Sequence, residues 1–266
     1  YWERADFMKT NKKVGLALGA GGARGYAHIG LLQVFMENGI PIDIVTGCSM
    51  GSLVGGLFAA GCDMYILEKF AENFDIMRYA DVNLRTGGFI GGHKLLDLIR
   101  MFTKGMKIEQ TNIPYACVAV DLGGACLKTF TDSYYLHDAI RASISIPGAF
   151  APYEIDGRYY IDGGVLERLP IDAARKLGAD IVIAVDVNYR GWEQDRPKNL
   201  IDTMTLTMNI PDWMFSKENE KKADYLIVPD IKKYDPFDFS TAKEVIKIGR
   251  VAALSCIDEV KAMLTD

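Results

Sequence analysis

Histidine is scarce in this chain: among 266 residues there are only three, and acidic residues outnumber basic ones, so the net charge is −5. The negative balance argues against nucleic acid as a partner, because such binding depends on basic surfaces that neutralise phosphate groups. It also argues against electrostatic capture by an anionic membrane, which leaves only a transient contact with a membrane surface open.

The usual metal-binding spacings are also absent. The five cysteines form no CxxC pair, and none of the three histidines is spaced with a cysteine or another histidine as zinc motifs require. We therefore expect no metal and no cofactor. Reduced cysteines within apolar runs indicate a reducing compartment, so the expected location is cytoplasmic.

Long apolar runs are missing too. No stretch reaches the roughly 18 residues of a membrane-spanning helix, and residues 1–12 have no apolar core of the kind found in signal peptides. These first residues are interpreted as an N-terminal extension or a tag remnant. No repeat, linker or low-complexity tract divides the remainder, so residues 13–266 are expected to form one domain.

What the chain does contain is an alternation of strand-like and helix-like segments, with 49% hydrophobic residues to build a core. Short apolar runs predict strands, and apolar residues at helical spacing predict helices. The predicted strands are 14–18, 42–46, 115–120, 127–131, 181–187 and 225–228, and the predicted helices include 63–74, 93–103 and 241–264. This order predicts an α/β fold, a three-layer sandwich with a mainly parallel central sheet and helices on both faces.

The first chemical motif is a serine in a tight turn. The segment Gly47-Cys48-Ser49-Met50-Gly51 has the Gly-x-Ser-x-Gly spacing of a nucleophile elbow, placed where a predicted strand ends and a helix begins. Gly47 and Gly51 allow strand and helix to pass closely, and a serine at a helix N-terminus meets N–H groups that favour developing negative charge. The alternative is a plain strand-to-helix turn with Ser49 as a capping residue.

A glycine-rich loop, residues 19–25, follows the first strand and opens onto a helix, which is the arrangement of an anion-binding cradle. A dinucleotide site expects Gly-x-Gly-x-x-Gly, whose first glycine is missing here, and a P-loop expects Gly-Lys-Ser/Thr, which is absent. The remaining interpretation is an oxyanion hole made by the N–H groups of Gly21, Gly22 and Ala23. Arg24 is expected to order this loop, to bind an anionic head group, or simply to lie on the surface.

A serine nucleophile needs a base, and histidine is the usual one. His28 and His137 fall within or at the start of predicted helices, and His93 follows a glycine pair, so none occupies an evident catalytic turn. Asp162 is the stronger candidate, because it ends a strand-like run and precedes Gly163-Gly164, where backbones can approach closely. Burial beside an apolar site would raise its pKa and make it a better base. The alternatives are a histidine base or a simple Asp-Gly hairpin turn.

Taken in order, these motifs resemble the patatin-like phospholipase family. The resemblance covers residues 13–187 most strongly, and it rests on residues 19–30, 47–51, 141–148 and 162–164. It implies a patatin-like fold, a dyad of Ser49 and Asp162, a glycine-loop oxyanion hole and hydrolysis of acyl esters of lipids without a cofactor. Lipids or other acyl esters would then be the partners.

Two positions depart from the family pattern. Ala20 replaces a common glycine of the loop, which requires a negative φ, and Met50 replaces a small residue, which narrows the expected site. The methionine-rich segment 204–215 is a candidate cover for an acyl chain, or else an ordinary core helix. Outside the lipid-hydrolase interpretation, the same loop would suit a non-catalytic nucleotide- or anion-binding module. A thioesterase or an esterase for short esters would use the same residues.

Overall fold

A computed structural model describes residues 7–79, 91–188 and 218–265, together with 197, 203, 204, 206, 207 and 210. Its central sheet has eight strands in this part of the chain. They are β1 Val14–Leu18, β2 Ile44–Cys48, β3 Tyr115–Asp121, β4 Cys126–Phe130, β5 Tyr153–Ile155, β6 Arg158–Asp162, β7 Ile181–Val185 and β8 Tyr225–Ile227.

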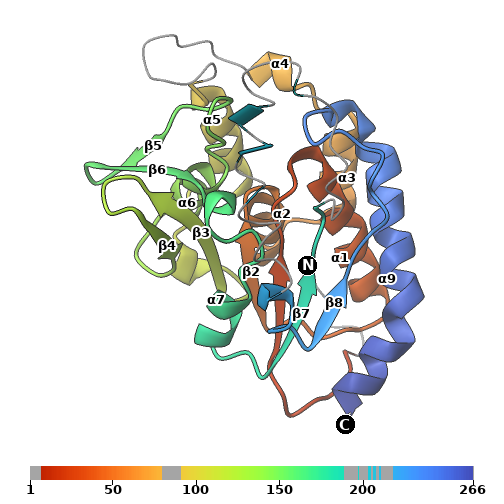
Figure 1. Cartoon of the computed structure of the whole chain (residues 1–266). Helices are drawn as coiled ribbons and strands as arrows, with labels where there is room; N and C mark the ends of the chain where they lie inside the picture. The colour runs from red at the N-terminus through yellow and green to blue at the C-terminus, as the bar shows by residue number, and fades with distance from the viewer. Residues whose placement is uncertain are drawn as a thin grey trace.

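Five neighbouring strands, in the order β3-β2-β1-β7-β8, form the parallel part of the sheet (Figure 1). Every residue of β1, β2, β3 and β7 is buried. Parallel strands are covered on both faces, which accounts for their continuous apolar sequences. β4 and β6 pair antiparallel with β3, and β5 pairs antiparallel with β6, so the sheet is mixed on this side.

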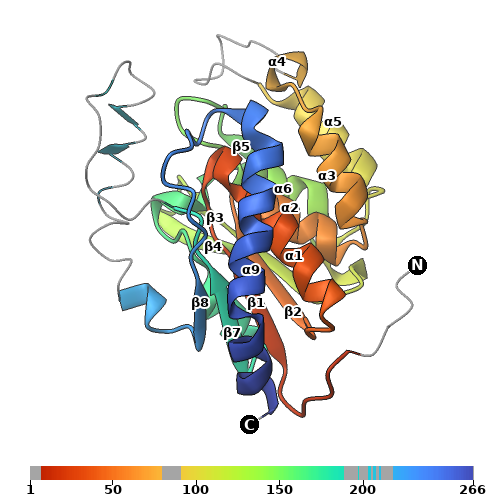
Figure 2. The ribbon, with the colours of Figure 1, turned by 90° about the vertical axis from the view of Figure 1, so that its right-hand side faces the viewer.

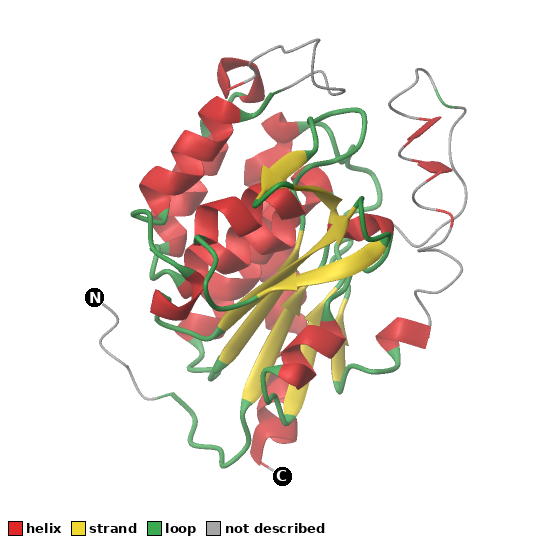
Figure 3. Ribbon diagram, turned by 90° about the vertical axis from the view of Figure 1, so that its left-hand side faces the viewer, coloured by secondary structure: helices red, strands yellow, loops and turns green. Residues whose placement is uncertain are grey.

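Helices cover both faces of the sheet, as predicted. The α-helices are α1 Ala27–Glu37, α2 Met50–Ala59, α3 Met64–Glu72, α4 Ile76–Tyr79, α5 His93–Phe102, α6 Leu136–Ser143, α7 Ile171–Lys176 and α9 Ala242–Thr265. Short 3₁₀ turns are η1 Gly22–Tyr26, η2 Ile108–Gln110, η3 Gly163–Val165 and η4 Phe239–Thr241. Most helices pack into one large core on one face of the sheet, and Figure 2 shows this face with α9 in front. α7 covers the opposite face, which is turned toward the viewer in Figure 3.

The predicted elements agree with the structure to within two residues, and β2 is shifted at both ends. It runs from Ile44 to Cys48 and not over 42–46. Asp43 accounts for the late start, because its carboxylate accepts the N–H of Val14, the first residue of β1, at 2.8 Å. The shift carries the strand directly into Ser49.

Two further expectations concern the methionine-rich segment and membrane-spanning helices. Of the methionine-rich segment 204–215, only 204, 206, 207 and 210 fall within the described residues, so its proposed role as a cover lies outside them. Across the described ranges, no helix combines the length and the apolar character needed to cross a membrane.

Candidate active site

Ser49 stands between β2 and α2, at the carboxyl edge of the parallel strands. Its backbone has φ 52° and ψ −123°, a combination that residues with a side chain rarely adopt. Such strain persists only where surrounding contacts hold it, and a nucleophile elbow is strained in this way. Only 4% of the residue is exposed, and its side chain makes no capping hydrogen bond to α2. The geometry therefore favours an elbow over an ordinary capping turn.

The two glycines around Ser49 are required by close contacts. A Cβ on Gly47 would lie 2.4 Å from the carbonyl oxygen of Gly51, and a Cβ on Gly51 would lie 2.2 Å from the carbonyl oxygen of Leu18. Both contacts are with backbone atoms, which cannot move aside without distorting the sheet or the helix. The turn thus packs the start of α2 directly against β1 and β2.

Asp162 reaches the same edge of the sheet through the antiparallel strand β6. Cys48 of β2 pairs with Val118 of β3, and the next residue of β3, Ala119, pairs with Asp162. Since β4 pairs with the other side of β3 at both positions, β2 and β6 lie along the same side and their ends meet there. The side chains of Ser49 and Asp162 meet at this junction in a hydrogen bond.

Burial raises the pKa of Asp162 above its ordinary value, since only 3% of the residue is exposed. The opposite effect comes from the Ser49 hydrogen bond, from the N–H of Gly164, 2.7 Å from Oδ1, and from the charge of Arg168. The Cys48 thiol lies 3.9 Å from the same oxygen, and burial together with Asp162 raises its own pKa, so it stays protonated. A carboxylate with a raised pKa is a stronger base than one in water.

The end of α6 holds the backbones of both residues. The N–H of Ser49 donates to Ser143 Oγ at 3.0 Å, and that hydroxyl donates to a β3 carbonyl oxygen at 2.7 Å. Two residues on, the carbonyl oxygen of Ser145 accepts the N–H of Asp162 at 2.9 Å. Ser143 and Ser145 are both fully buried. Sequence reasoning gave neither a role, and their only signal was the family-like segment 141–148.

Two amides of the glycine-rich loop, those of Gly21 and Gly22, are candidates for the predicted oxyanion hole. Within the described residues, no acceptor is found for the N–H of Gly21 or of Gly22, and Gly22 lines the same cavity as Ser49. Gly22 has φ 57°, and a Cβ there would lie 2.2 Å from the carbonyl oxygen of Pro236. The N–H of Ala23 donates to that same oxygen at 2.8 Å. The amide of Ala23 thus already has an acceptor, which favours Gly21 and Gly22 among the three residues predicted for an oxyanion hole.

Arg24 fastens the loop to the segment that follows β8. Its Nε donates to the carbonyl oxygen of Tyr234 at 2.7 Å. Burial lowers the pKa of the guanidinium, and the neighbouring Asp235 acts in the opposite direction. These contacts favour loop ordering over the other two roles considered for Arg24. Ala20 is not among the residues with positive φ, so its backbone meets the requirement for an alanine at this position of the loop.

None of the three histidines lines the cavity at Ser49 in the described part of the chain. His28 is fully buried, its Nε2 donates to the carbonyl oxygen of Gly19 at 2.9 Å, and burial lowers its pKa to about 4. His137 is buried in α6, and burial lowers its pKa as well. His93 begins α5 and lines a different groove. The geometry gives a histidine base no support.

An apolar cavity of about 100 Å³ lies beside Ser49. Apart from Ser49 and Gly22, aliphatic and aromatic side chains line it, and Met50 is one of them. Such a lining suits an acyl chain and offers no charged group to a nucleotide. In the sequence, the helices that line this cavity show only as apolar residues at helical spacing in 63–74 and 93–103. That spacing by itself indicates ordinary core helices and not a cavity.

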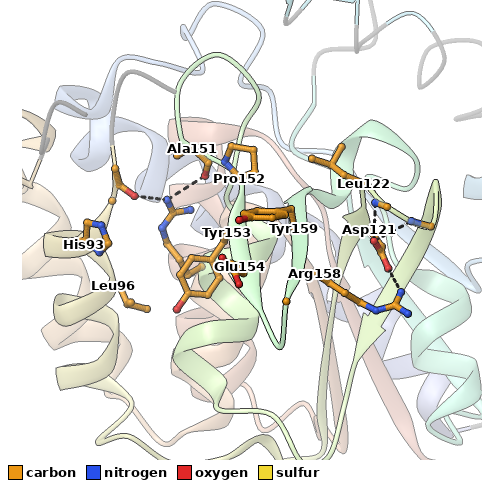
Figure 4. A pocket seen from close by; sticks show the side chains of 16 residues that line it. His93, Leu96, Asp121, Leu122, Ala151, Pro152, Tyr153, Glu154, Arg158 and Tyr159 are labelled. Atoms are coloured by element: carbon orange, nitrogen blue, oxygen red, sulfur yellow. Dashed lines mark hydrogen bonds and ion pairs between the residues drawn. The ribbon is translucent and has the colours of Figure 1, made fainter. Parts of the chain in front are cut away.

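A second and wider groove, of about 1370 Å³, lies beside the edge strand β5 (Figure 4). His93, Asp121 and Arg158 line it, and the Asp121 carboxylate pairs with Arg158 at 2.6 Å. Neither Ser49 nor Asp162 lines this groove, so its size does not make it the reaction site. Nowhere in the described ranges do three or more histidine, cysteine or acidic side chains gather as a metal site.

The sequence matches the patatin-like phospholipase family over residues 16–175. An uncharacterized NTE family protein of Mycobacterium tuberculosis is 43% identical over 185 residues, which cover 67% of this chain and 50% of that protein. Lysophospholipase NTE1 of Pyricularia oryzae is 35% identical over 201 residues, which cover 73% of this chain and 13% of that protein. The chain thus spans half or less of the length of these relatives.

Two solved structures share the fold at low sequence identity. VipD from Legionella pneumophila has a TM-score of 0.63 at 12% identity, over 94% of this chain and 67% of that one. The type III effector protein ExoU has a TM-score of 0.52 at 14% identity, over 94% of this chain and 53% of that one. The family match itself spans the Ser49 turn and Asp162. On this match and these relatives, the chain belongs to the patatin-like phospholipase family.

Proposed function

We propose that this protein is a serine acyl-hydrolase that cleaves carboxylic esters of lipids, with Ser49 as nucleophile and Asp162 as its base. One observation carries the proposal: the strained Ser49 shares a hydrogen bond with a buried carboxylate and also lines an apolar cavity. A binding module has no need of a strained serine paired with a carboxylate of raised pKa.

In the first step, Ser49 Oγ attacks the ester carbonyl carbon while its proton passes to the Asp162 carboxylate. The carbonyl oxygen becomes negative, and the N–H groups of Gly21 and Gly22 stabilise it; one such donor is typically worth about 3–4 kcal/mol. The bond to the alcohol oxygen then breaks, and Asp162 returns the proton to the departing alcohol. The product on the enzyme is an acyl ester of Ser49.

In the second step, water attacks the acyl carbon and gives its proton to Asp162. The bond to Ser49 Oγ breaks, the proton returns to that oxygen, and the carboxylic acid leaves. The cycle consumes one water and needs no electron transfer, so the proposed chemistry requires no cofactor. The names of the relatives, phospholipase and lysophospholipase, favour a lipid as the ester, and so does the apolar cavity.

Labelling with a fluorophosphonate tests the proposal, because this probe phosphonylates an activated serine. We expect one adduct, located on the peptide that contains Ser49, and its loss in Ser49→Ala. Ser255→Ala is the matched control, since Ser255 is an exposed serine on α9 whose hydroxyl bonds only within its own helix. Labelling that survives Ser49→Ala, or that disappears equally in the control, would refute the assignment.

A further inference from the structure

Three helical segments line the cavity at Ser49 with the same spacing. α2 contributes Met50, Leu53, Val54 and Leu57, which are positions i, i+3, i+4 and i+7 of one helix face. α3 and the turn after it contribute Leu67, Phe70, Ala71 and Phe74, and α5 contributes Leu95, Leu98, Ile99 and Phe102. Apolar faces of this kind normally pack against one another. Here they leave a slot between them.

The slot has a reactive end and a far end. At the reactive end, Tyr26, which follows the glycine loop, contacts Phe239, and Phe239 contacts Phe74, with ring centroids 6.2 Å apart in both pairs. Phe74 continues to Phe70 at 5.8 Å, and Phe70 to Phe102 at 5.1 Å. This unbroken row of rings forms one wall of the slot, opposite the aliphatic face of α2.

The far end is defined by the deepest residues of the three faces. Leu57 is the last cavity residue of α2, counted from Ser49, Phe102 is the last of α5, and Leu67 is the first of α3, which follows α2 after a short turn. Leu57 and Leu67 are only 2% and 6% exposed, whereas Phe102 is partly exposed, so the floor is buried at its two leucines and reaches the surface at Phe102. Figures 1 and 2 place α4, which follows Phe74, at the opposite end of α3.

We propose that the acyl chain of the substrate lies in this slot along α2, and that the floor of Leu57, Leu67 and Phe102 limits its length to about eight carbons. The helix rises about 1.5 Å per residue, so Met50 to Leu57 spans about 10 Å. An extended chain with carbon–carbon bonds of about 1.5 Å advances about 1.3 Å per carbon, which gives roughly eight carbons. The inference rests on the proposed function and adds the class of substrate, medium-chain acyl esters.

Hydrolysis of p-nitrophenyl esters with 2 to 16 acyl carbons tests this length limit. For the wild type, kcat/KM should rise by roughly threefold to fourfold per added methylene, as expected for burial of each group, and should level off or fall beyond about eight carbons. Ala71→Phe places a ring in the middle of the slot. It should lower the ratio of octanoyl to butyryl kcat/KM by at least about tenfold, because the longer chain loses its buried methylenes.

Two further variants separate the slot from general effects. Ile66→Phe adds a ring on the exposed outer face of α3, where Ile66 is 63% exposed, and should leave the chain-length profile unchanged. Phe102→Ala lowers the floor and should move the optimum to chains at least two carbons longer, which also covers the case that Ala71→Phe does not fold. An active wild type whose profile neither Ala71→Phe nor Phe102→Ala alters would overturn the inference and leave the proposed function standing. A wild type that cleaves no ester of any length would overturn the proposed function.

Discussion

Ser143→Ala tests whether the end of α6 holds the nucleophile in its strained conformation. The Ser143 hydroxyl accepts the N–H of Ser49 at 3.0 Å and donates to the carbonyl oxygen of Val118 at 2.7 Å. Alanine removes both contacts and adds no volume. Because position 143 is fully buried, the N–H of Ser49 loses its acceptor at a residue whose φ is 52°.

The expected size of the effect follows from these contacts. A buried N–H without a partner costs about 1–3 kcal/mol, and a backbone strained like that of Ser49 stores about 1–3 kcal/mol. Loss of the hydrogen bond is therefore comparable with the strain that it helps to hold. We expect the free energy of unfolding to fall by about 2 kcal/mol. If the variant must recover the strained Ser49 conformation before each reaction, a similar free energy is added to the activation barrier. At about 1.4 kcal/mol per tenfold, kcat then falls by roughly 10- to 100-fold.

Urea unfolding and ester turnover measure the two effects, with Ser145→Ala as the matched control. Ser145 is equally buried, but in the described part of the chain its hydroxyl bonds only to Arg141. Its contact with Asp162 is through the backbone, which alanine keeps. The control should lose stability and retain most of kcat. Equal loss of kcat in both variants, or full kcat in Ser143→Ala, would show that the Ser143 hydroxyl does not position the nucleophile.

Three other outcomes follow from the site. Asp162→Asn should lower kcat by at least about a hundredfold, since the amide cannot accept the proton, yet raise the melting temperature at neutral pH. The sign follows from the pKa of Asp162, which is higher in the folded than in the unfolded protein, so the native state loses stability as rising pH removes the proton. Asparagine stays neutral and avoids this loss. A lower melting temperature would contradict the argument. Because the pKa of Asp162 is raised, the carboxylate should become protonated, and kcat/KM should fall, at a pH above the ordinary aspartate pKa of about 3.9. If kcat/KM fell only below that pH, Asp162 would not be the base. Gly22→Ala should cost about a hundredfold in kcat, because its Cβ meets the Pro236 carbonyl oxygen and displaces the amide; near-normal kcat would remove Gly22 from the oxyanion hole.

Local sequence determined the elements that carry the site. Strand β1, the glycine loop and the Ser49 turn could be predicted because strand, turn and helix propensities act over a few residues. The predicted elbow needed glycines at 47 and 51, and the structure gives the reason: a Cβ at either position would lie 2.4 Å or 2.2 Å from a backbone carbonyl oxygen. The β2 boundary was misplaced because a side chain contact between Asp43 and β1 decides where that strand begins.

Tertiary structure alone decided which groups are free to act. The sequence made Gly21, Gly22 and Ala23 equal candidates for an oxyanion hole, but the carbonyl oxygen of Pro236, distant in sequence, occupies the amide of Ala23. Likewise nothing in the segment 141–148 indicates that the hydroxyl of Ser143 accepts the N–H of Ser49. Contacts of this kind depend on how loops far apart in the chain pack together.

The cavity shows the same division most clearly. The apolar faces of α2, α3 and α5 are evident from local sequence, because the spacing of their hydrophobic residues follows the helical repeat. Whether such faces close into solid core or leave room for a ligand depends on the distances between the helices. Only the folded chain sets those distances, and in this protein they leave an apolar space beside Ser49.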